Sequence, residues 1–173
     1  MRVSVIGGST VTDEEYELAR EVGRLLGERG HTVVCGGLGG VMEAVCRGAH
    51  EADQREASDE RAGAQRHVSS ERDGNTIGIL PGERRAAAND WVDTAIATGL
   101  GNARNPLVVM NGDAAIAIDG GGGTLSEIGF THVFDRPVAG LGTHQIETLD
   151  WIEHVATPEA AVDYIETVSG CSE

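Results

Sequence analysis

Short apolar runs that end in glycine and lead into helical patterns constrain this fold more than any other feature. Glycine clusters at residues 7–8, 36–40 and 120–123 each follow a strand-like run and precede a helical pattern. Alternation of strands and helices is typical of a parallel sheet covered by helices on both faces. A chain of 173 residues suits one domain. The sequence therefore predicts a single-domain α/β fold, doubly wound and Rossmann-like, with a mainly parallel sheet.

The hydrophobic periodicity places the individual elements. We expect strands at residues 2–6, 31–35, 76–80, 94–98, 114–118 and 137–141, and helices at about 12–28, after 40, around 103–106, at 124–134 and at 157–168. Residues 51–73 are charged, rich in Ala, Gln and Ser, and lack apolar periodicity, which predicts a flexible solvated insertion.

The charge composition excludes several functions. The net charge is −15, and all 13 basic residues are arginine. Lysine-free acidic surfaces suit a cytoplasm of very high salt, which indicates halophilic adaptation; the alternative is an acidic mesophilic protein with biased codons. Without lysine, a Walker A loop and a Schiff base are both excluded. A broad basic patch for nucleic acid or membrane is disfavoured, and no apolar run is long enough to span a bilayer. Because the first residues read as a strand rather than a signal peptide, we expect a cytoplasmic protein.

The glycine loops predict a ligand site. In a doubly wound sheet such loops meet outside the carboxyl ends of the strands, where nucleotides and phosphates bind. The run 120–123 allows backbone N–H groups to approach an anion closely. Thr124 can cap the following helix or bond a phosphate, and Glu127, in the first turn, adds a carboxylate that marks a candidate active site. No GxGxxG fingerprint is present, so we expect no conventional dinucleotide cofactor.

Arg104 is the second candidate. An arginine in a first helical turn opposes the helix dipole, and a bidentate contact to phosphate or carboxylate would explain it. The alternative is an arginine facing solvent.

The cysteines do not indicate a metal centre. Cys35 and Cys46 are expected to be buried thiols, and Cys171 lies far from them in the sequence. Cys46 and His50 have the spacing of a metal pair but lack a third ligand nearby, so we expect no metal.

Four motifs together resemble the LOG (Lonely Guy) superfamily, whose members have long carried a lysine decarboxylase label. They are Gly-Gly-Leu-Gly-Gly-Val-Met at 36–42, Gly-Ile-Leu-Pro-Gly at 78–82, Ala-Arg-Asn at 103–105 and Gly-Gly-Gly-Gly-Thr-Leu-Ser-Glu at 120–127. The Ala-Arg-Asn form is most similar to the branch that includes molybdenum cofactor carrier proteins. The label itself finds no support, because a PLP enzyme needs a lysine.

The resemblance implies roles for individual residues. Arg104 and Glu127 stand at the family's catalytic positions. Gly121, Gly123 and Thr124 stand at its phosphate-binding positions. The expected ligand-binding residues are Gly7, Gly8, Ser9, Gly36, Gly37, Gly40, Met42, Asn105, Gly120, Gly121, Gly122, Gly123 and Thr124. Two departures bear on the ligand: Asn105 replaces a lysine, and Asp119 replaces a proline and adds negative charge beside the glycines.

Three functions follow as hypotheses. The first is a phosphoribohydrolase that cleaves the N-glycosidic bond of AMP or a cytokinin-type nucleotide, with Glu127 acting on the ribose or on water. The second is a non-catalytic carrier of molybdenum cofactor, and the third is a nucleotide sensor. We expect no resident cofactor, a bound nucleotide, phosphate or molybdopterin-type ligand, and a homo-oligomer (dimer or tetramer). The apolar residues of the helix at 124–134 either form that interface or pack on the sheet.

Overall fold

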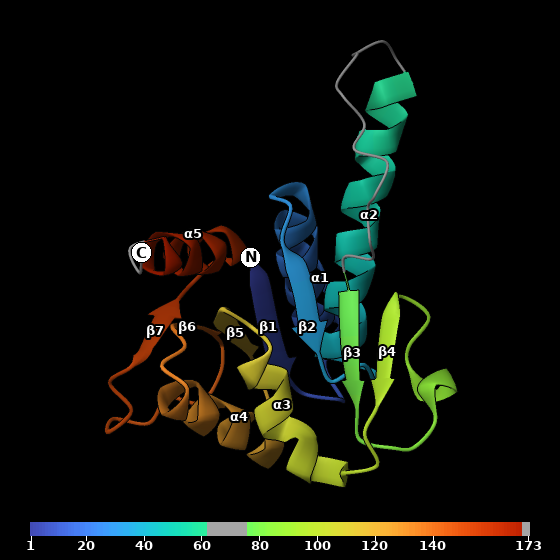
Figure 1. The fold of residues 1–173 in the computed structure, drawn as a ribbon. Coiled ribbons are helices and arrows are strands. Elements are labelled where there is room, and N and C mark those ends of the chain that lie inside the picture. Colours follow the sequence, from blue (N-terminus) through green and yellow to red (C-terminus); the bar gives the residue numbers. More distant parts are fainter. Residues whose placement is uncertain (62–75, 171–173) are drawn as a thin grey trace.

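A single parallel sheet forms the centre of the molecule (Figure 1). The computed structural model describes residues 1–61 and 76–170, and over these residues seven strands lie in the order β4-β3-β2-β1-β5-β6-β7. The strands are β1 (Arg2–Gly7), β2 (Thr32–Cys35), β3 (Thr76–Leu80), β4 (Thr94–Ala97), β5 (Ala114–Ile118), β6 (Val138–Leu141) and β7 (Ile152–Val155). The order reverses between β1 and β5, so the topological switch point lies between these two central strands.

Helices cover both faces of the sheet, as predicted. They are α1 (Asp13–Glu28), α2 (Val41–Arg61), α3 (Asn105–Met110), α4 (Gly122–Val133) and α5 (Pro158–Ser169), with short 3₁₀ helices η1 (Arg85–Ala87) and η2 (Gly101–Arg104). α1, α2 and α5 share one core with Val3 and Val5 of β1, whereas α3 and α4 share the other with Ile6. Alternate residues of a strand therefore reach opposite faces, as a pleated strand requires.

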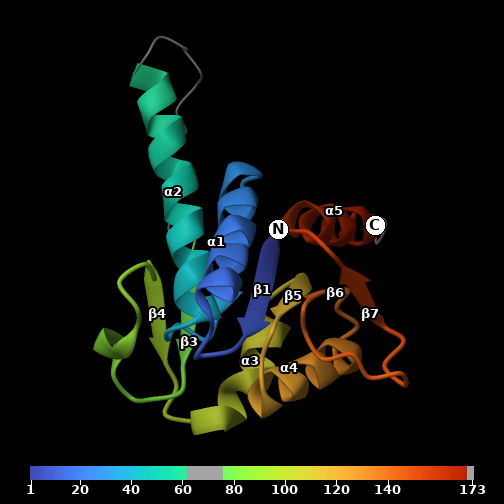
Figure 2. The same cartoon turned by 180° about the vertical axis from the view of Figure 1, so that it is seen from behind.

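Glycine lets α1 and α2 pack closely, and Figure 2 shows them side by side. A Cβ on Gly23 would lie 2.0 Å from the carbonyl oxygen of Val45, and one on Gly48 would lie 1.9 Å from that of Arg20. α1 begins where the sequence predicts, because Thr12 and Glu15 form a capping box at its N-terminus.

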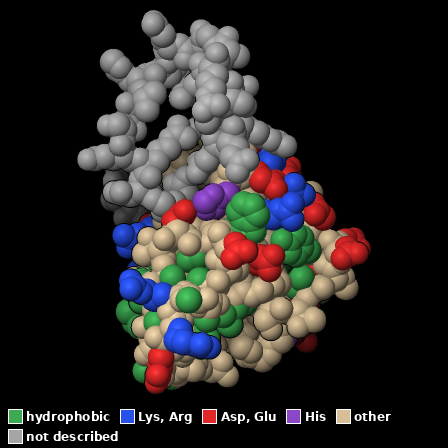
Figure 3. All heavy atoms as spheres, turned by 90° about the vertical axis from the view of Figure 1, so that its right-hand side faces the viewer, with side chains coloured by type: hydrophobic (Ala, Val, Ile, Leu, Met, Phe, Trp, Pro, Cys, Tyr) green, Lys and Arg blue, Asp and Glu red, His purple; other side chains and the backbone are tan. Residues whose placement is uncertain are grey.

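The arginines of α1 and its C-cap form ion pairs. Arg20, Arg24 and the C-cap residue Arg29 each contact two carboxylates. On the face beside β4, arginine and acidic side chains are interspersed with apolar ones (Figure 3). Because exposed ion pairs are weak individually, these pairs contribute mainly by offsetting the repulsion of an acidic chain.

The structure differs from the sequence-based expectations in three places. The helix α2 continues to Arg61, so residues 51–61 are helical rather than irregular; residues 62–73 of the expected insertion lie outside the described residues. The edge strand β7 was not predicted. α4 begins at Gly122, two residues earlier than expected, which places Glu127 in its second turn rather than its first. Within the described ranges, no helix is both long enough and apolar enough to cross a bilayer.

Candidate functional site

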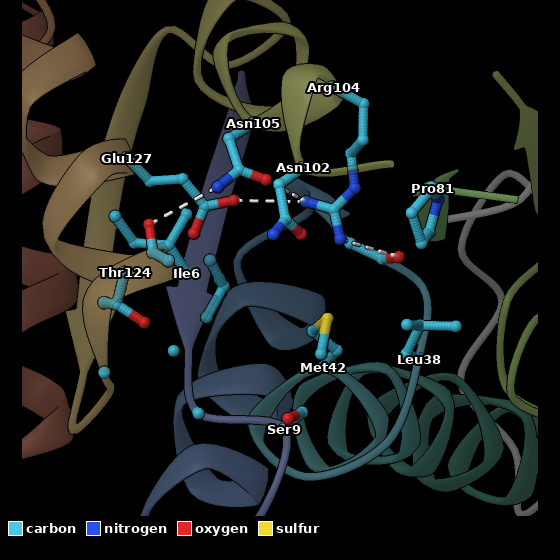
Figure 4. Close-up of a pocket in the computed structure, with 16 residues that line it drawn as sticks. Ile6, Ser9, Leu38, Met42, Pro81, Asn102, Arg104, Asn105, Thr124 and Glu127 are labelled. Carbon is cyan, nitrogen blue, oxygen red and sulfur yellow. Dashed lines mark hydrogen bonds and ion pairs between the residues drawn. The ribbon is translucent and has the colours of Figure 1, made fainter. Parts of the chain in front are cut away.

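The switch point holds a cavity of about 270 Å³ at the carboxyl ends of the strands (Figure 4). Most of the residues proposed from the sequence line it. They are Gly7, Gly8, Ser9, Gly36, Met42, Arg104, Asn105, Gly121, Gly123, Thr124 and Glu127. The loops that follow three different strands therefore converge on one site, as the position of the glycine clusters predicts.

Four of the proposed glycines do not line the cavity. Gly37, Gly40 and Gly120 have positive φ angles of 74°, 67° and 113°, which favour glycine for backbone reasons. Gly122 is exposed at the first residue of α4. Gly37, Gly40 and Gly120 therefore shape the loops instead of forming the wall of the site.

Sequence reasoning also missed part of the wall. Val5, Ile6, Leu38, Pro81 and Asn102 line the cavity beside the predicted residues. Leu38 and Pro81 lie inside two of the recognised motifs, so the motifs themselves were the available signal. Val5 and Ile6 are apolar strand residues and carry no signal of a site.

Arg104 and Glu127 form an ion pair inside the cavity. Arg104 Nη1 lies 3.2 Å from Glu127 Oε1, and each residue is only 7% exposed. Arg104 ends η2 and directly precedes α3, while Glu127 projects from α4 (Figure 4). Arg104 therefore lies before α3 and not in its first turn, and it makes one contact to the carboxylate instead of the expected bidentate one. The hypothesis of a solvent-facing side chain is wrong.

The remaining donors of Arg104 are only partly used. Nη1 also donates to Asn105 Oδ1 at 3.2 Å, and Nη2 donates to the carbonyl oxygen of Gly36 at 3.5 Å. The buried Nε has no hydrogen-bond partner. An unsatisfied buried donor costs about 1–3 kcal/mol, so this placement of Arg104 is made at some cost to stability.

Asn105 connects the guanidinium to α4. Its Oδ1 accepts from Arg104, and its Nδ2 donates to Ser126 Oγ at 3.0 Å and to the carbonyl oxygen of Gly123 at 3.5 Å. Asn105 thus adds no charge but links the guanidinium of Arg104 to the first residues of α4.

The carboxyl of Glu127 titrates near neutrality. Burial raises its pKa from 4.5 to about 7, and the attraction and hydrogen bond of Arg104 act in the opposite direction. Since desolvation disfavours the ionised form, the carboxyl can hold or release a proton at neutral pH. Such a group is equipped for general acid–base chemistry.

The N-terminus of α4 has no side-chain cap. Gly121 is the N-cap residue, and Thr124, which was expected to cap this helix, lies inside its first turn and lines the cavity. The first-turn amides and the positive end of the helix dipole are therefore available to an anion.

Asp119 lies beside the cavity without lining it. It adopts a left-handed backbone conformation (φ 47°), and its Oδ2 lies 2.9 Å from the point where a Cβ on Gly8 would be. Its carboxylate therefore reaches across the switch point from the end of β5 to the loop after β1. The negative charge predicted next to the glycine run is present there.

The cysteines behave as buried thiols. The Sγ atoms of Cys35 and Cys46 lie 3.6 Å apart, and both residues are buried and free. His50 Nε2 instead lies 3.1 Å from Asp93 Oδ1, so Cys46 and His50 have separate partners. Cys171 lies outside the described residues.

Known proteins are similar to this chain over nearly its whole length. The model of the SLOG cluster4 family matches residues 1–56 and 62–169. An uncharacterized protein of Archaeoglobus fulgidus is 35% identical over 164 residues, which cover 95% of this chain and 93% of that protein.

Two solved structures are similar as well. The molybdenum cofactor binding protein from the phototrophic bacterium Rippkaea orientalis matches with a TM-score of 0.78 and 29% identity, over 96% of each chain. The molybdenum cofactor carrier protein from Chlamydomonas reinhardtii matches with a TM-score of 0.75 and 25% identity, over 98% of this chain and 97% of that one. The resemblance read from the four motifs is thus confirmed. The chain belongs to the SLOG cluster4 family.

Proposed function

We propose that this protein binds a small phosphorylated heterocycle of the molybdenum cofactor type and carries it without chemical change. The observation that carries the proposal is that the buried Arg104 and the uncapped N-terminus of α4 line the same cavity. One phosphate could satisfy both, since arginine and helix amides are preferred phosphate donors.

The rest of the wall fits a planar ring. Leu38, Met42 and Pro81 provide apolar contacts, and the amide of Asn102 can donate to and accept from a heterocycle edge (Figure 4). An apolar wall with few polar groups is typical of small-molecule sites. Similarity to two proteins named for molybdenum cofactor supports the carrier over the hydrolase.

The charge balance also favours binding over turnover. Arg104 is already paired with Glu127, Asn105 supplies no second cation, and Asp119 is close by. A site with one shared cation can hold a phosphate that must later be released. It offers less stabilisation to a developing transition-state charge.

A phosphoribohydrolase is the second candidate, and the raised pKa of Glu127 is the observation that favours it. In that reaction Glu127 would deprotonate the attacking water or stabilise the oxocarbenium-like ribose. The product would be a free base and ribose monophosphate.

A binding and turnover experiment separates the two. We expect AMP to bind, as measured by calorimetry, while chromatography detects no free base from AMP or its N6-substituted relatives. Release of base by the wild type, abolished in Glu127→Gln, would establish the hydrolase and overturn the carrier. Failure of both AMP and a phosphopterin to bind would refute any phosphorylated ligand.

We further propose that two copies associate through the helices α3 and α4. The ionisable side chains of these helices are Glu127, which is buried, and His132, which is exposed, although the chain has a net charge of −15. Met110 and Val133 are 47% and 66% exposed on these helices. An uncharged face is where two acidic copies could meet with least repulsion. Light scattering should report a dimer or tetramer, and Val133→Arg should give a monomer; a monomeric wild type would refute the interface.

A further inference from the structure

The loop after β6 holds the glycine loop of the site. Thr143 Oγ1 donates to the carbonyl oxygen of Asp119 at 2.7 Å, and His144 Nε2 lies 3.0 Å from that of Gly121. Because a carbonyl oxygen only accepts, His144 must carry its proton on Nε2 in this contact. Two neighbouring side chains thus bind two carbonyls of the glycine loop. We call this pair the strap.

The strap controls which way the amides of the loop point. The described peptide bonds are all trans, so the C=O and N–H of one peptide unit point in opposite directions. The carbonyl of Asp119 points toward Thr143, and that of Gly121 accepts from both His144 and the amide of Leu125, which is 3.0 Å away in α4. The N–H groups of Gly120 and Gly122 therefore turn away from the strap. Gly121 lines the cavity, whereas the strap residues do not, so the strap holds the loop from outside the site.

The glycine loop needs such support. Asp119 has a φ angle of 47°, and a left-handed conformation at a residue other than glycine persists only where the surroundings determine it. No side chain caps α4, and glycine gives the loop little stiffness of its own. Thr143 is well placed for the task, because it is only 7% exposed.

We propose that Thr143 and His144 are positioning residues that fix the amides of Gly120–Gly123 for an anionic ligand. They touch the loop and not the ligand. The proposal rests on the proposed binding of a phosphorylated molecule. It adds that the affinity for the phosphate depends on two residues outside the cavity.

AMP and inorganic phosphate are the probes of affinity, measured by calorimetry. Loss of one hydrogen bond should weaken binding of each about three- to tenfold in Thr143→Val and in His144→Ala. Thr143→Ser and His144→Gln retain a donor and should bind like the wild type. Thr131→Val is the matched control, because Thr131 is also buried and its hydroxyl donates to the carbonyl of Ile128 at 2.7 Å, away from the loop.

A second measurement needs no ligand. The ¹⁵N order parameters of the amides at 120–123 should fall from about 0.85 to below about 0.6 in Thr143→Val and His144→Ala. They should recover in the conservative variants. If the wild type binds neither probe, the proposed function fails while the order parameters still decide the strap. If the order parameters are the same in Thr143→Val, His144→Ala and the wild type, the proposed role of the strap is overturned. It is also overturned if the wild type binds the probes and these two variants bind them with the same affinity.

Discussion

The buried carboxyl of Glu127 should make the stability of the protein depend on pH in a way that one substitution removes. Its pKa rises from 4.5 in the unfolded chain to about 7 in the folded protein, chiefly because of burial. Each unit of pKa corresponds to about 1.4 kcal/mol, so ionising this group in the folded state costs about 3 kcal/mol of folding free energy. The protonated carboxyl of Glu127 therefore stabilises the folded state relative to the ionised carboxyl. This contribution to the free energy of unfolding is fully present below pH 4.5 and is lost as the pH rises through about 7.

Glu127→Gln should remove this dependence. The amide stays uncharged at every pH and can still accept from Arg104. The free energy of unfolding of the variant, relative to the wild type, should therefore rise by about 3 kcal/mol between pH 4 and pH 8, with most of the change between pH 5 and 7.

Urea denaturation at constant ionic strength measures this difference at each pH. Glu83→Gln, which removes an exposed carboxylate, is the matched control for the loss of one charge. The free energies of unfolding of Glu127→Gln and the wild type are compared at each pH. If their difference changes by less than about 1 kcal/mol across this range, the carboxyl of Glu127 does not have a raised pKa.

Four further substitutions test the fold by the same denaturation assay. Gly120→Ala should destabilise the protein by about 1–3 kcal/mol and weaken AMP binding, because the φ angle of Gly120 is 113°. Gly122→Ala should leave stability unchanged or slightly raised, because a Cβ added there meets nothing within 4 Å. Gly48→Ala should cost about 1–3 kcal/mol or more, since its Cβ would lie 1.9 Å from the carbonyl of Arg20. Thr12→Ala should cost about 1 kcal/mol through loss of the capping box at α1, and an unchanged midpoint would contradict that role.

The architecture was predictable because the signals that set it are local. Each buried strand reads as a short apolar run, and a glycine-containing turn marks its end. The same turns located the site, since parallel strands bring their carboxyl ends to one edge. Arg104 and Glu127 were found through their position in motifs, and the structure places their side chains within 3.2 Å.

The missed features depend on tertiary contacts or weak patterns. β7 is an edge strand in which only Ile152 is buried, so its sequence shows no alternation. Residues 51–61 lack an apolar stripe, yet they continue a helix that began at Val41, and helix propagation costs less than nucleation. The strap residues Thr143 and His144 act on backbone carbonyls, which no sequence pattern reveals.

The pterin content of the purified protein is the measurement that tests the central claim most directly. After expression in a host that makes molybdenum cofactor, the wild type should co-purify with a phosphorylated pterin, detected by its fluorescence after oxidation. Arg104→Gln should lose most of it, whereas Arg84→Gln, which alters an exposed arginine, should retain it. A wild type without pterin, or equal pterin in Arg104→Gln, would contradict a carrier site built on the buried arginine.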